Sequence, residues 1–332
     1  MSVEVPDRVL VVGSGSIAAR HVRNLLALGA REVILQTRRD VSSVPGFKDE
    51  RITVTRDLPD DCPKFAIVAN DTDHHVSAAL ALVKRGTHLL IEKPIAATVN
   101  DDLRLLAVQA HERGLVVRVA YNLRFLPVLR EVERLLRDGA LGQVLFVRIE
   151  AGQHLGAWRP GRAYALGYSA SPARGGGAAL DLSHELDYMR MLFGHPTVSC
   201  VHHAHSGSLG IESADIFDAI YEFPHGLVCS VHLDYLESAL RRRLRIVGTD
   251  GVIECDLAAH RLSVDGGAVT QTFVDEHLFD TAQTYVDEVV NFLSEASGDA
   301  ASEVRLSTIA DAQAILELLG DISADHSSHQ GR

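Results

Sequence analysis

The run Val9-Leu10-Val11-Val12-Gly13-Ser14-Gly15-Ser16-Ile17-Ala18 joins an apolar strand to a helical pattern over residues 17–28. Such a strand-turn-helix connection can bind the pyrophosphate of a dinucleotide on the N–H groups of the helix N-terminus. In this pattern Gly13 permits the tight turn, Gly15 lets the backbone approach the phosphates, and Ala18 replaces the third glycine. We therefore predict that the turn contacts a cofactor through Gly13, Gly15, Ser16 and Ile17.

Composition limits the classes of partner. The 332 residues, 46% of them hydrophobic, suffice for two packed domains. The formal net charge of −12, with no basic cluster beyond Arg241–Arg243, disfavours nucleic acid as a partner. No run approaches the roughly 20 apolar residues of a membrane span, and the N-terminus lacks a basic segment followed by an apolar one. We expect a cytoplasmic protein that binds neither nucleic acid nor a membrane.

Apolar strand-like runs alternate with helical patterns through the first third of the chain. The expected strands are residues 9–12, 33–35, 52–55, 65–69, 88–91 and 116–119, and the expected helices are residues 17–28, 76–85 and 101–112. Gly29, Gly86 and Gly114 each follow a helical pattern, as is typical of a left-handed C-terminal residue. This alternation predicts an α/β fold, a doubly wound parallel sheet that forms a Rossmann domain over residues 1–121.

The pattern changes after residue 121. The expected elements there are helices at 127–137, 178–192, 281–295 and 306–319, and strands at 144–150, 216–223, 227–233, 244–247 and 252–255. Hairpin connections between these strands predict an α+β domain with an open mixed or antiparallel sheet. We assign residues 122–324 to a substrate and oligomerisation domain and 325–332 to a frayed tail, and leave open whether the last two helices pack back on the Rossmann domain.

Four polar segments follow these elements in order. The first, Glu92-Lys93-Pro94, comes directly after a strand, at the carboxyl edge where doubly wound sheets bind ligands. The others are Tyr121-Asn122-Leu123-Arg124-Phe125-Leu126-Pro127, then Trp158-Arg159-Pro160 with Tyr164 and Tyr168-Ser169-Ala170, and finally Gly175-Gly176-Gly177 followed by Asp181-Leu182-Ser183-His184-Glu185-Leu186-Asp187.

In combination these segments resemble the glucose-fructose oxidoreductase/inositol dehydrogenase (Gfo/Idh/MocA) family, over about residues 8–320. The resemblance implies a nicotinamide-dependent dehydrogenase or ketoreductase acting on a ring carbon of a sugar, amino sugar or cyclitol, including aminoglycosides and nucleotide sugars. It implies a role in carbohydrate or antibiotic biosynthesis and assembly as a homodimer or homotetramer. By matching, Lys93 is the lysine of the E-K-P motif, His184 is the acid/base residue, and His75 is structural.

The spacing around His184 departs from the family pattern. Members similar to inositol dehydrogenase place an aspartate four residues before the histidine, whereas Asp181 precedes His184 by three. On a continuous helix Asp181, His184 and Asp187 span only about 120°. All three can then face one cleft, or Asp187 can face the core. We predict that the catalytic residues are Lys93, His184 and Asp181, with Asp187 ranked behind them.

The chemistry itself requires a base on the hydroxyl and a hydride acceptor about 3–3.5 Å from the carbinol carbon. Lys93 and His184 are both able to act as that base, and the residues leave open which one transfers the proton. We expect the two to meet at the cofactor from their separate domains. The predicted substrate-binding residues are Tyr121, Asn122, Arg124, Trp158, Tyr164, Tyr168, Asp181 and His184.

The segment Gln36-Thr37-Arg38-Arg39-Asp40 places arginines where NAD-specific folds carry an acid for the ribose. We predict NAD(P) as the cofactor with a preference for NADP. In the alternative, Arg38 stacks on the adenine or faces solvent and Asp40 reaches the ribose. The remaining predicted cofactor contacts are Arg38, Arg39, Asn70, Glu92 and Lys93.

Less specific interpretations remain for several of these residues. Lys93 can simply end a strand, His184 can be a satisfied helix histidine, and Arg124 and Trp158 can be structural. His202-His203-Ala204-His205 alternates across a strand without carboxylates nearby, so we predict no metal site. Two other functions compete: a redox-neutral epimerase or NAD-dependent glycosidase that retains its cofactor, and a non-catalytic NAD(P)-binding sensor.

Overall fold

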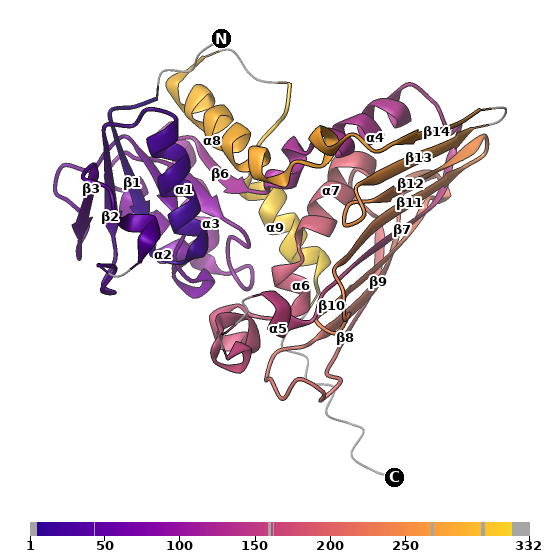
Figure 1. Ribbon diagram of the computed structural model, residues 1–332, viewed down its shortest axis with the longest axis horizontal. Coiled ribbons are helices and arrows are strands. Elements are labelled where there is room, and N and C mark those ends of the chain that lie inside the picture. Colours follow the sequence, from indigo (N-terminus) through magenta and orange to yellow (C-terminus); the bar gives the residue numbers. More distant parts are fainter. Residues whose placement is uncertain are drawn as a thin grey trace. The chain divides into compact units, whose positions relative to one another are not determined.

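The computed structural model describes residues 5–42, 44–158, 161, 163–266, 269–299 and 303–320. The pair Arg159-Pro160 and the expected tail at 325–332 lie outside these residues. The chain divides into two compact units, which Figure 1 draws in sequence colours. The first consists of Met1–Phe125 and Thr281–Ala314, and the second of Leu126–Asp280 and Ile315–Arg332.

A seven-stranded sheet forms the centre of the first unit, in the order β15-β6-β5-β4-β1-β2-β3. The strands are β1 (Arg8–Val12), β2 (Glu32–Gln36), β3 (Ile52–Thr55), β4 (Phe65–Val68), β5 (His88–Glu92), β6 (Val117–Ala120) and β15 (Ser307–Thr308). All neighbours are parallel except β15, which pairs antiparallel with β6. The carboxyl ends of β1 and β5 therefore lie at the same edge of the sheet.

Helices cover both faces of this sheet. They are α1 (Ser16–Ala27), α2 (His75–Val83), α3 (Asp101–Glu112) and α8 (Thr281–Ser297). Val9 and Val11 of β1 share a core with residues of α1 and α8, while Leu10 and Val12, which point the other way, are also buried. Strands buried on two sides carry continuous apolar runs, which is why the sequence indicated them. The predicted doubly wound α/β domain is confirmed.

Local signals explain where helices of this unit begin and end. The side chain of Asn100 accepts a hydrogen bond from the Leu103 N–H at 2.9 Å and so caps α3, whose first turn carries two aspartates. The helix is followed by Gly114 at φ +62°, a left-handed conformation that favours glycine. The capping residue and the terminal glycine thus set the bounds of α3.

An eight-stranded sheet forms the second unit, in the order β14-β13-β12-β11-β7-β10-β9-β8. The strands are β7 (Val144–Gly152), β8 (Val198–Ala204), β9 (Ile216–Glu222), β10 (Val228–Asp234), β11 (Arg241–Gly248), β12 (Gly251–Asp256), β13 (Arg261–Gly266) and β14 (Val269–Phe273). Only β7 and β10 pair in parallel, so the predicted mixed sheet is confirmed.

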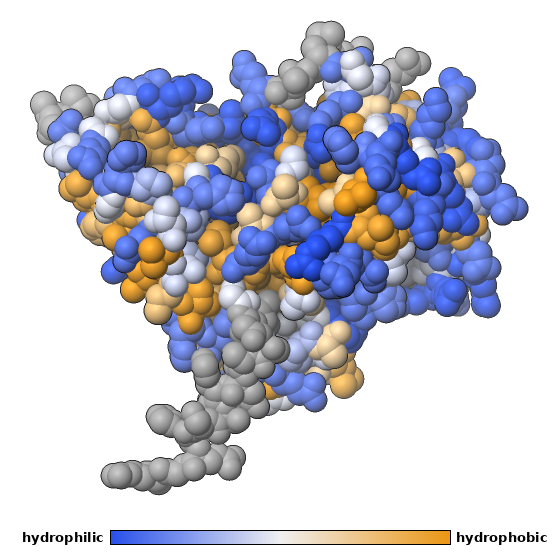
Figure 2. All heavy atoms as spheres, turned by 180° about the vertical axis from the view of Figure 1, so that it is seen from behind, coloured by the Kyte–Doolittle hydropathy of each residue, from blue (hydrophilic) through white to orange (hydrophobic). Residues whose placement is uncertain are grey.

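One face of this second sheet is covered and the other is open. On β9 the residues Phe217, Ala219 and Tyr221 are buried, whereas Asp218 and Ile220 between them are exposed. Besides α8, the helices after residue 125 are α4 (Pro127–Arg137), α5 (Leu155–Trp158), α6 (Ala178–Asp181), α7 (His184–Phe193) and α9 (Ile309–Leu318). On the face of the molecule drawn in Figure 2, apolar groups lie in patches among hydrophilic residues. Among the described residues, no helix is long and apolar enough to span a membrane.

The helix expected over residues 178–192 is two helices. Leu182 adopts φ −100° and ψ +27°, and α7 restarts at His184 after a two-residue turn. A separate contact holds each helix. Asp181 at the end of α6 accepts a hydrogen bond from Tyr235, and Glu185 of α7 forms an ion pair with Arg242. The assumption of 100° per residue between Asp181 and His184 is therefore wrong, because it requires an unbroken helix.

Candidate functional site

The glycine turn between β1 and α1 depends on Gly13 for its own packing. Gly13 adopts φ +113°, and a Cβ built on it would lie 2.4 Å from the carbonyl oxygen of Ala69. Its N–H donates to the carbonyl oxygen of Gln36 at 3.0 Å, so the turn is fixed to β2 as well. A side chain at this position would push β1 and β4 apart at their carboxyl ends.

Gly15 is different, because its own surroundings do not exclude a side chain. A Cβ on Gly15 would meet nothing within 4 Å. Gly15 is the N-cap of α1 and provides no side-chain cap, and the first turn of the helix carries no acidic residue. The helix N-terminus thus presents N–H donors beside open space, and a phosphate group is the natural acceptor for them. This arrangement fits the pyrophosphate of a dinucleotide.

The loop after β2 determines what meets the ribose of such a cofactor. Thr37, not an acid, follows the strand, and its hydroxyl donates to the Ser14 hydroxyl at 2.9 Å. Arg38 is 83% exposed and lies 3.9 Å from Asp57, while Arg39 contacts Asp71 at 3.4 Å. Asp40 accepts from the Ser42 N–H, which lowers the pKa of its carboxyl group. The acid of this loop is therefore engaged in the loop itself.

The E-K-P segment at the end of β5 is held at both of its ends. Glu92 accepts a hydrogen bond from His21 at 2.7 Å and from the Lys93 N–H at 3.3 Å. His75 contacts the carbonyl oxygens of Pro94, at 2.9 Å, and Asn70, at 3.0 Å, and its complete burial lowers the pKa of its imidazole. Two buried histidines, one on α1 and one on α2, thus contact the residues on either side of Lys93.

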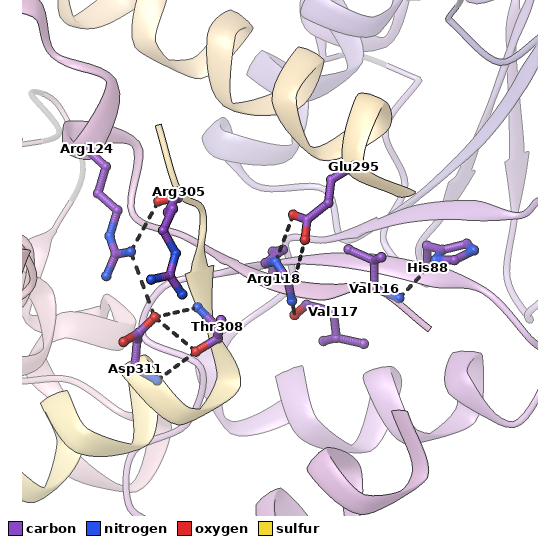
Figure 3. Close-up of polar contacts among 9 residues, drawn as sticks. All are labelled: His88, Val116, Val117, Arg118, Arg124, Glu295, Arg305, Thr308 and Asp311. Atoms are coloured by element: carbon purple, nitrogen blue, oxygen red, sulfur yellow. Dashed lines mark hydrogen bonds and ion pairs between the residues drawn. The ribbon is translucent and has the colours of Figure 1, made fainter. Parts of the chain in front are cut away.

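Residues 121–125 are built into the first unit. Tyr121 is 1% exposed, and the Asn122 amide donates to the Thr284 hydroxyl of α8 at 2.6 Å. Arg124 points toward the segment that leads into α9 (Figure 3), where it donates to the Arg305 carbonyl oxygen at 3.2 Å and lies 3.9 Å from the Asp311 carboxylate. Through these contacts Arg124 holds the segment that leads into α9.

In the second unit, Asp181 is paired with a tyrosine that the sequence analysis did not select. The buried Tyr235 hydroxyl donates to Oδ2 of Asp181 at 2.6 Å. Burial, followed by the charge of Asp181, raises the pKa of Tyr235 well above its ordinary value. The Tyr235 ring packs edge-on against Trp158 at a centroid distance of 5.2 Å. The three side chains form one cluster at the end of β10.

His184 begins α7, and its neighbour anchors the helix. Glu185 is fully buried, and both of its carboxylate oxygens accept from Arg242 of β11, at 2.6 and 3.1 Å. A bidentate pair of this kind fixes direction as well as distance. His184 is 9% exposed, whereas Asp187 is 1% exposed. The register of the helix therefore leaves His184 the more accessible of the two.

The predicted aromatic residues lie in the irregular segment before α6. Tyr164 donates to the Leu209 carbonyl oxygen at 3.3 Å and packs edge-on with His154. Trp158 and Tyr164 pack against the buried cluster that includes Tyr235. Tyr168 is half-buried in a 3-10 helix, Tyr168–Ala170. Asp181, Tyr235, Trp158 and Tyr164 thus share one neighbourhood.

Four residues that matter to these arrangements escaped the sequence analysis: His21, Glu185, Tyr235 and Arg242. His21, Glu185 and Arg242 lie inside ordinary helical or strand patterns, Tyr235 comes directly after β10, and each acts through a partner far away in the chain. Glu185 and Arg242, for example, are 57 residues apart. A charged residue on the buried face of a predicted helix was the one signal available for Glu185. Among the described residues, no group of three or more His, Cys, Asp or Glu side chains is placed to hold a metal ion.

Comparisons with known proteins match both parts of the chain. Residues 8–121 match the family model "Oxidoreductase family, NAD-binding Rossmann fold", and residues 129–254 match the model "GFO/IDH/MocA C-terminal domain". A 1,5-anhydro-D-fructose reductase of Ensifer adhaerens is 24% identical over 255 residues, 73% of each chain. An inositol 2-dehydrogenase of Saccharopolyspora erythraea is 34% identical over 148 residues, 42% of this chain and 44% of that protein.

Solved structures share the fold over almost the whole chain. A levoglucosan dehydrogenase in complex with NADH superposes with a TM-score of 0.81 at 19% identity and covers 96% of this chain and 97% of its own. An inositol dehydrogenase homologue from Azotobacter vinelandii, complexed with NAD+, gives a TM-score of 0.79 at 15% identity and covers 95% and 94%.

Proposed function

The chain belongs to the Gfo/Idh/MocA oxidoreductase family, and from this premise we propose that it transfers a hydride between a nicotinamide cofactor and a ring carbinol or ketone carbon of a sugar, amino sugar or cyclitol. The observation that carries the proposal is the placement of two features in the first unit. The open N-terminus of α1 and the Glu92-Lys93-Pro94 segment follow parallel strands at the same sheet edge. Ligands of doubly wound folds bind at this edge.

The residues that would hold the cofactor come from the start of α1 and from the ends of β1, β4 and β5. Gly13, Gly15, Ser16 and Ile17 would bind the pyrophosphate, with Asn70, Glu92 and Lys93 toward the nicotinamide. Bound NAD(P) supplies the hydride acceptor for oxidation or the hydride donor for reduction. Everything else in the reaction, the positioning of the hydroxyl and the transfer of its proton, is the work of this chain's side chains.

We assign the proton transfer to Lys93 and His184. An amine and an imidazole can each accept the proton of a substrate hydroxyl and return it in the reverse reaction. Asp181, fixed by Tyr235, would orient the substrate or the imidazole as a hydrogen-bond acceptor. Trp158, Tyr164 and Tyr168 would offer aromatic faces and hydroxyl groups to a polyhydroxylated ring.

The names of the relatives support a cyclic polyol as substrate. Three of them are a reductase of 1,5-anhydro-D-fructose and dehydrogenases of inositol and levoglucosan, whose substrates are rings with several hydroxyl groups. The negative net charge of −12 adds a mild preference for cationic members of this class, such as amino sugars and aminoglycosides.

We further propose that NADP binds more tightly than NAD. Two observations support this preference: Thr37, which contacts Ser14, stands where NAD-specific folds carry an acid, and Oδ1 of Asp40 already accepts from the Ser42 N–H. Arg38 is exposed beside them and can pair with a 2′-phosphate. Arg38→Ala should then bring the two dissociation constants together, while Arg31→Ala, an exposed arginine elsewhere in the unit, should leave their ratio unchanged.

The open face of the second sheet supports the proposed self-association. One row across seven strands reads His202, Asp218, His232, Glu150, Arg243, Asp256 and Arg261, each opposite the next in the strand register. Basic side chains and carboxylates alternate along it. A second copy that faces this row and is displaced by one strand sets basic residues opposite carboxylates at six of the seven positions. Sedimentation of wild type and Arg243→Glu, which should shift toward monomer, tests this proposal.

The function is tested by a substrate screen with both cofactors. The purified chain is incubated with NAD+ or NADP+ and myo-inositol, levoglucosan, amino sugars, aminoglycosides or nucleotide sugars, and with NADPH and 1,5-anhydro-D-fructose for the reverse direction. Net change of nicotinamide absorbance with turnover is the expected result. Product formed without net reduction would favour the redox-neutral epimerase or glycosidase, and cofactor binding without any product would favour the sensor.

A further inference from the structure

His21 is a buried polar residue on a helix face that otherwise packs apolar side chains. It lies on α1 with Ala18, Val22 and Leu25, all of them buried, and is itself 0% exposed. A polar group in such a place costs free energy unless it is hydrogen-bonded. Its Nε2 lies 2.7 Å from Oε1 of Glu92, 71 residues later in the chain. This pair therefore connects the helix that follows the glycine turn to the end of β5.

The geometry of Glu92 extends the connection to the next residue. One carboxylate oxygen faces His21, and the other, Oε2, accepts from the backbone N–H of Lys93 at 3.3 Å. Both oxygens therefore act as acceptors, so the bond to His21 requires the proton on Nε2. The carboxylate has little freedom to turn while both bonds are present. The backbone of Lys93 is thus held through Glu92 by the imidazole of His21.

The surroundings of His21 make it a rigid support. Tyr285 of α8 packs edge-on against the imidazole at a centroid distance of 6.3 Å, and the Arg20 guanidinium lies 4.3 Å above the same tyrosine ring. A residue of α8 therefore packs against one side of the imidazole. Positions supported by packing in this way hold catalytic groups within the narrow tolerance that hydride and proton transfer require.

We infer that His21 is a positioning residue for Lys93, acting through the Glu92 carboxylate. The inference deepens the proposed function and rests on it for the role of the Lys93 amine, but the mechanical link can be measured without any substrate. Loss of the Nε2 donor frees the Glu92 carboxylate to turn, so that the Lys93 N–H loses its acceptor. The side-chain amine of Lys93 is then no longer held in place.

His21→Leu removes the donor and keeps an apolar side chain of similar volume, whereas His21→Gln keeps an N–H donor. His88 provides a matched control. It lies at the other end of β5 from Glu92, about 13 Å away at the usual rise per residue, and it accepts a hydrogen bond from the Val116 N–H at 3.0 Å. His88→Leu thus deletes a hydrogen-bonded histidine of the same strand. Hydrogen–deuterium exchange of the Lys93 amide, resolved to single residues, is the first readout.

We expect His21→Leu to speed exchange at the Lys93 amide about tenfold or more, with His21→Gln and His88→Leu within threefold of wild type. Exchange in His21→Leu within twofold of wild type would overturn the inference. If His21→Leu does not fold, His21→Phe removes the same donor and keeps an aromatic ring, with the same expected and contrary results. No substrate enters this measurement, so the failure of the proposed function cannot imitate its outcome.

Kinetics provide the second readout on the substrate that the screen identifies. His21→Leu should lower kcat by about 10- to 100-fold, as expected when a catalytic group is misplaced by about 1 Å, while the dissociation constant of the cofactor changes less than threefold. His21→Gln should recover most of kcat. Equal loss in His21→Leu and His21→Gln, or a loss confined to cofactor binding, would reduce His21 to a structural residue.

Discussion

Tyr235→Phe removes one hydroxyl group and leaves the shape of a buried ring unchanged. In the wild type this hydroxyl donates to Asp181 at 2.6 Å, and both residues are at least 96% buried. Depriving a buried carboxylate of a donor costs about 1–3 kcal/mol, while retention of the ring keeps the cavity contribution small. We expect urea denaturation to show a loss of this size. We also expect at least a tenfold fall in kcat on the identified substrate, because Asp181 loses its fixed orientation.

Tyr221→Phe is the matched control for this change. Tyr221 is equally buried, lies on the adjacent strand β9, and donates to the neutral Leu318 carbonyl oxygen at 2.7 Å. Its loss should lower stability by about 1 kcal/mol without affecting kcat. The reasoning would be refuted if Tyr235→Phe kept full activity, or if both variants lost activity in proportion to their lost stability.

The remaining predictions concern the glycine turn and the open sheet face. Gly15→Ala should leave the free energy of unfolding within about 0.5 kcal/mol of wild type and weaken cofactor binding at least tenfold. Gly13→Ala should lower the free energy of unfolding by roughly 1–3 kcal/mol or more, because its Cβ meets the Ala69 carbonyl oxygen. Calorimetric titration of the cofactor and urea denaturation distinguish the two variants, and equal effects would contradict the prediction. A hydrogen bond from His232 to Asp234 raises the pKa of His232 from 6.5 to about 9. The stabilisation by protonated His232 is complete below pH 6.5 and is lost as the pH rises through about 9. It amounts to about 1 kcal/mol, because the side chain is 44% exposed. The free energy of unfolding should therefore fall between pH 6 and pH 10 by about 1 kcal/mol less in His232→Asn than in wild type.

The fold could be predicted because its signals are local. Strands such as β5, buried on both faces, appear as continuous apolar runs, and Gly114 marks the end of α3 by a conformation that other residues avoid. The parallel pairing of β7 with β10 could not be read in the same way. These strands are about 80 residues apart in the chain. An apolar run does not indicate which strand it pairs with, or whether the pairing is parallel or antiparallel.

The arrangement of the candidate site residues could be predicted where they lie in short segments, and not where it depends on distant partners. Gly13, Gly15 and the Glu92-Lys93-Pro94 segment each follow a strand, so their place at the sheet edge followed from the fold. The expected helix geometry from Asp181 to His184 was wrong, because contacts of Asp181 with Tyr235 and of Glu185 with Arg242 stabilise a turn between them. Neither pairing has a spacing that the sequence displays.

The sequence also did not show that α8 packs in the first unit. An amphipathic helix shows that one face is buried but not which core buries it. Val289 and Phe292 pack with the strands of the first sheet, and Glu295 forms an ion pair with Arg118 of β6, which Figure 3 shows beside the end of α8. The sequence analysis left both packing arrangements of this helix open, and only the three-dimensional contacts decide between them.

Pre-steady-state reduction of the nicotinamide by wild type, Lys93→Gln and His184→Gln, measured beside the dissociation constant of the cofactor, tests the central claim most directly. Proton transfer by a positioned side chain contributes about 100- to 10,000-fold to a rate. We expect each substitution to slow reduction by an amount in this range while the cofactor still binds. Reduction at the wild-type rate in either variant would contradict it.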